Sequence, residues 1–211
     1  MKTFFPVTYS LLILLTCCDE DLSSRPDYFP LRQDQRIIYQ EYAAEALEDF
    51  SSPLSDEKIV YVLGDTVYDG HAYTLITNDD CRFRAVREEN GAYYQRTYWT
   101  CNTPAFDDNE TKFLDVKKAT GATWTDFVGE HQKISSTIRK RIPVKTFQDK
   151  TYRNIIVVER QYFHATQNGG WEFWLSTWHY YASGYGEIYS FSPYPMSYRY
   201  QDIGSLQVKI E

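Results

Sequence analysis

The chain contains 211 residues, with 22 Lys or Arg against 29 Asp or Glu, so its formal net charge is −7. This length suits one domain, and the acidic balance argues against nucleic acid or anionic surfaces as partners, because both attract cationic side chains. The 19 Tyr, 12 Phe and 5 Trp favour strands, since aromatic side chains pack well on a pleated sheet.

Residues 1–17 have the pattern of an export signal. Lys2 precedes an apolar run from Phe4 to Leu15, and Cys17, Cys18 and three acidic residues follow. The run is about a dozen residues, shorter than the roughly 20 that a membrane-spanning helix needs. The cysteines stand where a signal peptide is cleaved, which resembles a bacterial lipobox. We therefore predict a lipoprotein signal peptide over 1–17, with an ordinary cleaved signal as the alternative.

Cys18 is the predicted site of acylation, and Cys17 is the alternative. The acidic residues 19–21 follow Cys18 directly, and they resemble the surface-export tag of Bacteroidota-type lipoproteins. The predicted membrane contact is made by N-terminal acyl chains, because each buried CH₂ adds about 0.8 kcal/mol. Residues 18–27 are polar and without periodicity, so we interpret them as a flexible tether. Residues 28–211 are then expected to form a single β-rich domain.

The first half of this domain shows short strand patterns separated by turn residues. Pro30 lies in a loop that leads to the first strand, because proline has no backbone N–H for a sheet ladder. Asp69-Gly70 and Asn90-Gly91 predict hairpin turns, and residues 46–57 and 102–110 read as loops. Strands are expected near 36–45, 58–63, 71–77, 82–88 and 92–100.

Cys81 and Cys101 flank the predicted 82–100 hairpin and are candidates for a disulfide in an oxidising compartment. An odd-numbered loop centred on Gly91 would set them opposite each other. A two-residue Asn90-Gly91 turn would instead place Cys81 opposite Thr100, unless a bulge restores the pairing.

The second half continues the strand pattern, and no stretch of convincing length has a helical period. The expected fold is mainly β, a curved antiparallel sheet or a partly closed barrel or half-barrel of about nine or ten strands. The segment 121–124 reads as a short strand or a turn. Further strands are expected near 113–116, 134–145, 151–164, 171–182, 185–191 and 206–210.

Tryptophans are the candidate ligand-binding residues. Strand 171–182 is apolar on both faces, with Trp171, Phe173 and Leu175 predicted on one face and Trp174 and Trp178 on the other. Such a strand is buried on both faces or lines a cavity. The residues proposed to line the cavity are Trp124, Trp171, Trp174 and Trp178, and core packing is the alternative.

Catalytic and metal-binding patterns are weak. The four histidines, at 71, 131, 164 and 179, have no spacing typical of a metal site, and we expect neither a metal nor a cofactor. His164 and His179 are not expected to lie directly opposite each other. Carboxylates for glycoside hydrolysis are plentiful, but nothing singles out a pair.

Three patches resemble a family of uncharacterised Bacteroidota-type lipoproteins. The segment 28–31 is similar to the family's "YFPL…W.Y" start, and Gly121-Ala122-Thr123-Trp124 to its central "GxxW". The third patch, 178–188, is similar to its "WYA.GVG" motif, although Tyr185 replaces the valine. The resemblance implies a curved antiparallel sheet, no known cofactor and no established activity.

Together these observations predict a lipid-anchored protein of the cell envelope, held at the outer membrane, with the periplasmic or surface-facing side left open. We expect a non-enzymatic binding or interaction module for an apolar or glycan ligand or an envelope protein. The alternatives are an envelope or polysaccharide hydrolase and a structural component of an outer-membrane assembly. A hydrolase predicts carboxylates and a histidine in an aromatic cleft, and a structural component predicts a flat exposed apolar patch.

Overall fold

The computed structural model describes residues 27–44, 52–78, 82–99, 109–147, 149–192 and 204–209. Cys17, Cys18, Cys81 and Cys101 lie outside these residues, as does all of the predicted signal and tether up to residue 26. The described residues contain no helix long and apolar enough to cross a bilayer. Their twelve strands are β1 (Arg36–Ala44), β2 (Ser52–Tyr68), β3 (His71–Asn78), β4 (Arg82–Glu89), β5 (Ala92–Trp99), β6 (Thr111–Asp115), β7 (Thr123–Val128), β8 (Gln132–Phe147), β9 (Lys150–Ala165), β10 (Trp171–Ala182), β11 (Gly186–Ser192) and β12 (Gly204–Lys209).

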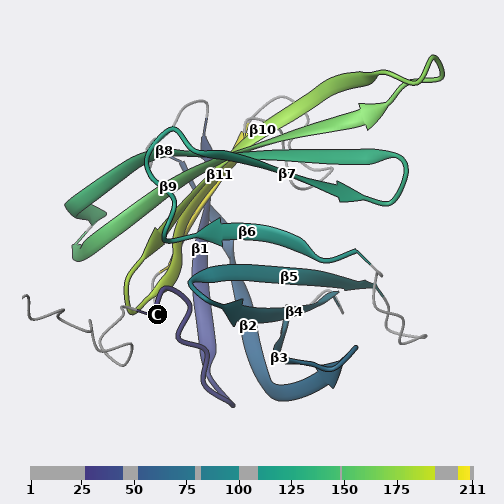
Figure 1. Ribbon diagram of the computed structural model, residues 1–211. Coiled ribbons are helices and arrows are strands. Elements are labelled where there is room, and N and C mark those ends of the chain that lie inside the picture. The colour runs from purple at the N-terminus through teal and green to yellow at the C-terminus, as the bar shows by residue number, and fades with distance from the viewer. Residues whose placement is uncertain are drawn as a thin grey trace, which may run out of the picture.

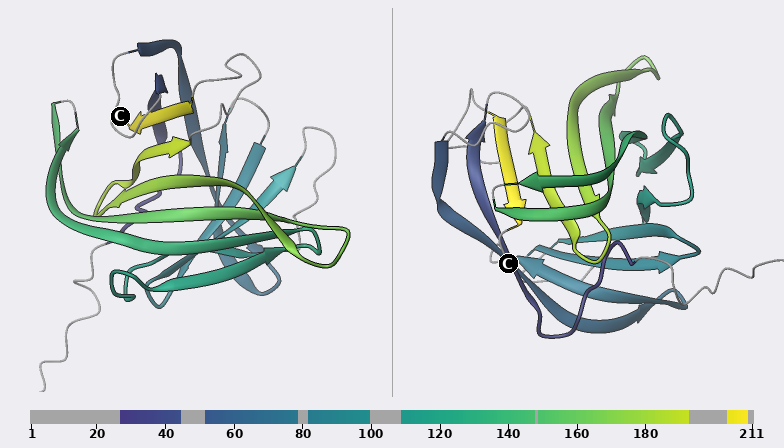
Figure 2. Two further views of the ribbon diagram at one scale, coloured as in Figure 1. Left: turned by 90° about the horizontal axis from the view of Figure 1, so that it is seen from above. Right: turned by 90° about the vertical axis from the view of Figure 1, so that its left-hand side faces the viewer.

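All twelve strands belong to one antiparallel sheet, which confirms the predicted fold class. The order is β6-β5-β4-β3-β2-β1-β12-β11-β10-β9-β8-β7, so the first and last strands of the chain pair in the middle. Figure 1 shows the labelled strands, and the two views of Figure 2 show that the sheet curls into a half-barrel. The edge strands β6 and β7 meet where Trp124 Nε1 on β7 donates a hydrogen bond to the carbonyl of Lys112, 2.7 Å away.

The hairpin turns follow the predicted chemistry. Asn90 and Gly91 both have positive φ, at 55° and 81°, as do Asp69 and Gly70, at 51° and 76°. Positive φ at both central residues is the conformation that suits the twist of a two-residue hairpin. The β4–β5 ladder accordingly pairs Glu89 with Ala92.

This register bears on the cysteine prediction. The ladder runs to Arg82 opposite Trp99, and paired residues therefore have numbers that sum to 181. The loop is two residues long, so the odd-numbered loop that would face Cys81 to Cys101 is not formed. The cysteines themselves lie outside the described residues, and their disulfide stays a prediction.

Strand β2 is much longer than the expected 58–63, and it takes in the end of the segment that we predicted as a loop. It begins at Ser52 and runs for 17 residues. Pro53 lies opposite Tyr42, beside the register shift between Gln40 and Tyr42. A proline is tolerated at such an irregularity, because the ladder hydrogen bonds are already interrupted there.

The two faces of the sheet carry separate hydrophobic clusters. We call the face inside the curl the inner face, because there Phe113 of β6 contacts Tyr181 of β10, two strands that are far apart in the sheet, with ring centroids 5.7 Å apart. On the opposite, outer face, Phe147 stacks on Tyr189 at 5.0 Å. The buried residues of the inner cluster include Val62, Ile76, Tyr93, Leu114, Trp124, Ile138, Ile156 and Val158.

A bulge in β10 corrects the predicted faces of that strand. Phe173 pairs with Phe163, but Leu175 pairs with Tyr162, and the register shift lies between Phe173 and Leu175. Adjacent residues of β9 face opposite sides of the sheet. Phe173 and Leu175 therefore lie on opposite faces, whereas strict alternation had placed them on the same one.

Candidate functional site

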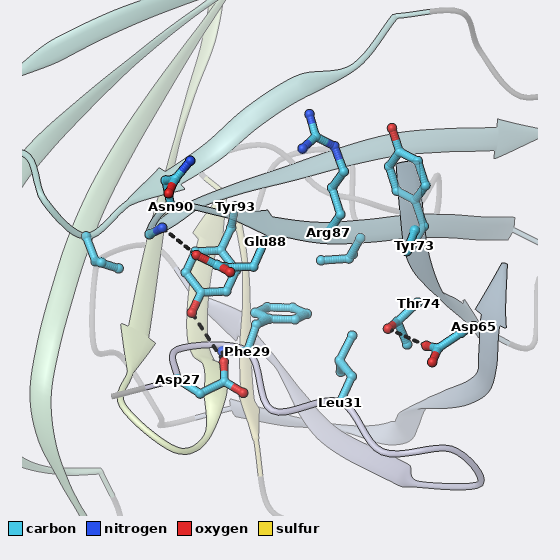
Figure 3. A pocket seen from close by; sticks show the side chains of 14 residues that line it. Asp27, Phe29, Leu31, Asp65, Tyr73, Thr74, Arg87, Glu88, Asn90 and Tyr93 are labelled. Atoms are coloured by element: carbon cyan, nitrogen blue, oxygen red, sulfur yellow. Dashed lines mark hydrogen bonds between the residues drawn. The ribbon is translucent and has the colours of Figure 1, made fainter. Parts of the chain in front are cut away.

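A cleft opens between the segment that precedes β1 and the strands β2 to β5 (Figure 3). Its volume is about 590 Å³, within the range of roughly 300–1,000 Å³ that is common for small-molecule sites. The lining residues come from five parts of the chain. They are Asp27, Phe29, Leu31, Asp65, Ala72, Tyr73, Thr74, Val86, Arg87, Glu88, Asn90, Gly91, Tyr93 and Val116.

The segment 27–31 forms one wall of the cleft and is held at several points. The Tyr28 N–H donates to the Tyr93 hydroxyl at 2.9 Å, and the Gly184 N–H donates to the Asp27 carbonyl at 2.6 Å. The rings of Phe29 and Phe113 make a T-shaped contact, with their centroids 5.4 Å apart. These contacts with β5, β6 and the β10–β11 turn hold the segment 27–31 in place, so this wall of the cleft is preformed.

Three exposed carboxylates lie around the apolar and aromatic lining, and each uses only one oxygen within the described structure. Asp27 Oδ1 accepts from the Tyr93 hydroxyl at 3.2 Å and from the Phe29 N–H at 2.8 Å. Asp65 Oδ1 accepts from Thr74 at 2.9 Å, and Glu88 Oε1 accepts from the Gly91 N–H. The second oxygen of each carboxylate is left to accept a ligand hydrogen bond.

Arg87 is the one basic residue in the lining, and its guanidinium is already engaged. Its Nε and Nη2 donate to the two carboxylate oxygens of Glu110, both at 2.6 Å, and its Nη1 donates to Glu89 at 2.7 Å. Burial opposes ionisation of Glu110, but these hydrogen bonds outweigh it and lower the pKa of Glu110. Among its described lining residues, the cleft therefore offers hydrogen-bond acceptors and aromatic rings but no free cation.

The four predicted tryptophans are not brought together, and none of them lines this cleft. Trp124 belongs to the inner core at 9% exposure, and Trp178 packs against the outer cluster. Trp171 and Trp174, at 37% and 50% exposure, lie toward the far end of the β9–β10 hairpin. The aromatic residues that do line the cleft are Phe29, which is half-buried, and Tyr73 and Tyr93, which are buried. The sequence analysis singled out none of these three as a ligand-binding residue.

An outer aromatic patch, which we define as Phe127, Phe163, Trp171, Phe173 and Lys133, covers part of the outer face. The rings of Phe127 and Trp171 are 5.7 Å apart, and those of Phe163 and Phe173 are 5.8 Å apart. Lys133 Nζ lies 4.4 Å from the centre of Phe163 and 5.2 Å from that of Trp171. Because Phe127 and Phe173 are both 55% exposed, this is an apolar surface of the kind that often marks an interaction site.

The histidines do not meet in the cleft. His164 pairs with Glu172 and His179 with Val158, so the two are not opposite each other, as expected. His179 is linked through Nδ1 to Glu187 at 2.7 Å and through Nε2 to the Thr177 hydroxyl at 2.8 Å. Burial opposes ionisation of Glu187, but His179 outweighs it and lowers the pKa of Glu187. A hydroxyl, an imidazole and a carboxylate in this order are the arrangement of an activated nucleophile, but Thr177 is buried.

No family model and no curated protein matches the chain. A protein from Bacteroides fragilis, provisionally described as exported and with a YmcC-like fold, is 11% identical, with a TM-score of 0.49. A protein from Parabacteroides distasonis, provisionally described as a lipoprotein, is 10% identical, with a TM-score of 0.45. Each comparison covers 88% of this chain and 98% of the other.

Proposed function

We propose that the chain is a lipid-anchored protein of the bacterial envelope whose β domain is a binding module, with its ligand in the cleft beside residues 27–31. The pattern of residues 1–18 supports export and acylation. The single observation that carries the binding role is the preformed cleft, which has aromatic walls and three carboxylates with one unused oxygen each. Membership of the Bacteroidota-type lipoprotein family is part of the same proposal.

A glycan is the ligand class that fits this cleft best. Sugar hydroxyls donate to carboxylate oxygens such as those of Asp65 and Glu88, and the apolar face of a sugar ring packs against aromatic side chains. An anionic ligand would meet three carboxylates and, among the lining residues that the structure describes, no free cation. A purely apolar ligand would leave the carboxylates next to it unsolvated, which is unfavourable.

The test is a binding titration of the exported protein against a panel of neutral oligosaccharides by calorimetry. Asp65→Asn and Glu88→Gln keep the shape of the cleft but weaken its hydrogen-bond acceptors, and each should weaken binding about tenfold, or roughly 1.4 kcal/mol. Asp149→Asn is the matched control, because Asp149 is exposed and does not line the cleft. Its affinity should equal that of the wild type.

Other results would favour the alternative functions. Cleavage of a bound oligosaccharide would show that the protein is a hydrolase and not a binding module. Binding that is lost on Trp171→Ala but not on Asp65→Asn would move the site to the outer aromatic patch. Absence of binding by every member of the panel would contradict the glycan proposal and leave the patch as a surface for a protein of an outer-membrane assembly.

A further inference from the structure

Two arginines on the inner face make no hydrogen bond or ion pair with another described residue, although the protein as a whole is acidic. Arg84 of β4 lies on the same face as Val86 of the inner cluster, and Arg160 of β9 lies on the same face as Val158. In the part of the chain that the structure describes, neither guanidinium makes a hydrogen bond or an ion pair. We call these two residues the inner arginine pair.

The burial of Arg160 makes its lack of a partner significant. The residue is 4% exposed, and its Nε is fully buried without an acceptor among the described residues. Its Cζ lies 5.8 Å from the centre of the Tyr162 ring. A buried guanidinium is strongly unfavourable unless its charge and its five donors are satisfied. Proteins leave few such groups, and each one requires an explanation.

Hydroxyl groups flank Arg160 on both neighbouring strands. Ser136 of β8 and Thr177 of β10 lie directly opposite it in the two ladders. Ser136 is fully buried, and its Oγ has no hydrogen-bond partner among the described residues. The guanidinium Nε of Arg160 and the hydroxyl of Ser136 therefore lie on neighbouring strands of the inner face, and neither has a hydrogen-bond partner among the described residues.

The carboxylates near the pair do not neutralise it at contact distance. Glu187 lies within electrostatic reach of both arginines, but it is bound to His179 at 2.7 Å. Asp126 also acts on Arg160 without an ion pair, and burial raises the pKa of Asp126, which favours its neutral form. Burial raises the pKa of Tyr181 overall, but the charges of both arginines lower it, so both act on the part of the inner face around Tyr181.

We propose that the inner arginine pair, together with Ser136, binds an oxyanion on the inner face of the half-barrel. The group is a carboxylate or a phosphate, because these oxygens accept the paired N–H donors of a guanidinium. The site is distinct from the cleft, whose lining contains neither Arg84 nor Arg160. It would allow an acidic protein to accept an anionic ligand that its surface charge disfavours.

The experiment measures binding of three probes to the full exported protein by calorimetry. Inorganic phosphate represents a free anion, glycerol 3-phosphate a lipid headgroup, and glucuronate an acidic sugar, each against sodium chloride of equal ionic strength. The variants are Arg160→Gln and Arg84→Gln. Arg153→Gln is the matched control, because Arg153 is an exposed arginine on the same strand as Arg160.

The proposal expects at least one probe to bind to the wild type and to Arg153→Gln. Arg160→Gln and Arg84→Gln should each weaken that binding by at least about tenfold. Arg84 is only partly buried, so we expect Arg84→Gln to fold. This variant tests the site even if Arg160→Gln does not fold. Binding of none of the probes, or equal affinity in all three variants, would overturn the proposal.

Discussion

Tyrosine explains much of how single residues stabilise this sheet. Tyr73 is buried, yet its hydroxyl donates to Glu110 at 2.6 Å and accepts from Arg96 at 3.0 Å. The Tyr39 hydroxyl likewise donates to the Glu187 carbonyl at 3.2 Å. A tyrosine ring fills the core while its hydroxyl satisfies a polar group at the boundary. The excess of Tyr in the sequence therefore reflects sheet packing, as we interpreted it.

At the same scale, the lowered pKa of Lys209 should make the stability of the protein depend on pH. Burial, and then Lys150, lower the pKa of Lys209 to about 8, and its Nζ donates to the Tyr185 carbonyl at 2.6 Å. The unfolded chain thus binds more protons between about pH 8 and 10.5, so the free energy of unfolding rises with pH there, by at most about 3 kcal/mol. Below pH 8 the full penalty for the buried charge remains.

The measurement compares wild type with Lys209→Met by urea unfolding at pH 7 and pH 9.5. The wild type should gain stability relative to the variant between these values. An identical pH dependence in both proteins would show that Lys209 titrates as it does in the unfolded chain. Tyrosines of the unfolded chain are already partly ionised at pH 9.5, but both proteins contain the same 19 tyrosines, so this contribution cancels in the comparison.

At the scale of elements, the two edge strands of the half-barrel contact each other. Strands β6 and β7 are at opposite ends of the sheet order, and the chain joins them through residues 116–122. The Trp124 indole spans the gap with its hydrogen bond to Lys112, and Lys112 Nζ lies 5.3 Å from the Trp124 ring. The Trp124 indole is therefore a buried link between the two edges of the half-barrel, and the Asp126 carboxylate of β7, which is also hydrogen-bonded to the backbone of Lys112, is a second one.

Trp124→Phe tests this link, because it keeps an aromatic ring but removes the N–H donor. We expect a loss of about 1–2 kcal/mol in the free energy of unfolding, since the Lys112 carbonyl loses its partner. Trp124→Ala should cost about 3–5 kcal/mol through the cavity it leaves. Denaturant unfolding provides both values. Trp171→Phe is the control, and it should change stability by less than about 0.5 kcal/mol.

At the scale of the whole molecule, the cleft lies close to the predicted anchor. Asp27 lines the cleft and is nine residues after Cys18. An extended chain covers at most about 3.3–3.6 Å per residue, so acylation at Cys18 would hold this side of the cleft within roughly 30 Å of the membrane. The proposed ligand would then be met near the membrane surface.

The anchor prediction is tested in the expressing bacterium with an alkyne analogue of palmitate. Cys18→Ala should abolish incorporation of the label and release the protein from the membrane fraction, because the acylated thiol is lost. Cys17→Ala should leave both unchanged. The opposite pattern would assign acylation to Cys17, and labelling of neither protein, wild type included, would favour an ordinary signal peptide.

Local chemistry determined the parts of this protein that the sequence alone could predict. Alternating apolar residues and the turns at Asp69-Gly70 and Asn90-Gly91 predicted an antiparallel β fold, because side-chain period and positive φ act within a few residues. The strand at 171–182 was located correctly for the same reason. The export pattern of residues 1–18 is equally local.

Only the tertiary structure decided which side chains meet. The bulge in β10 places Leu175 on the opposite face from Phe173. A pattern of alternating apolar residues cannot predict a register shift of one residue. The cleft joins Phe29 to Tyr93, residues 64 positions apart, and the inner arginine pair joins β4 to β9. Such contacts arise from the curl of the whole sheet, which brings non-neighbouring strands together across its inner face. The predicted tryptophans were separated by that same curl, because it buried Trp124 and left Trp171 and Trp174 exposed.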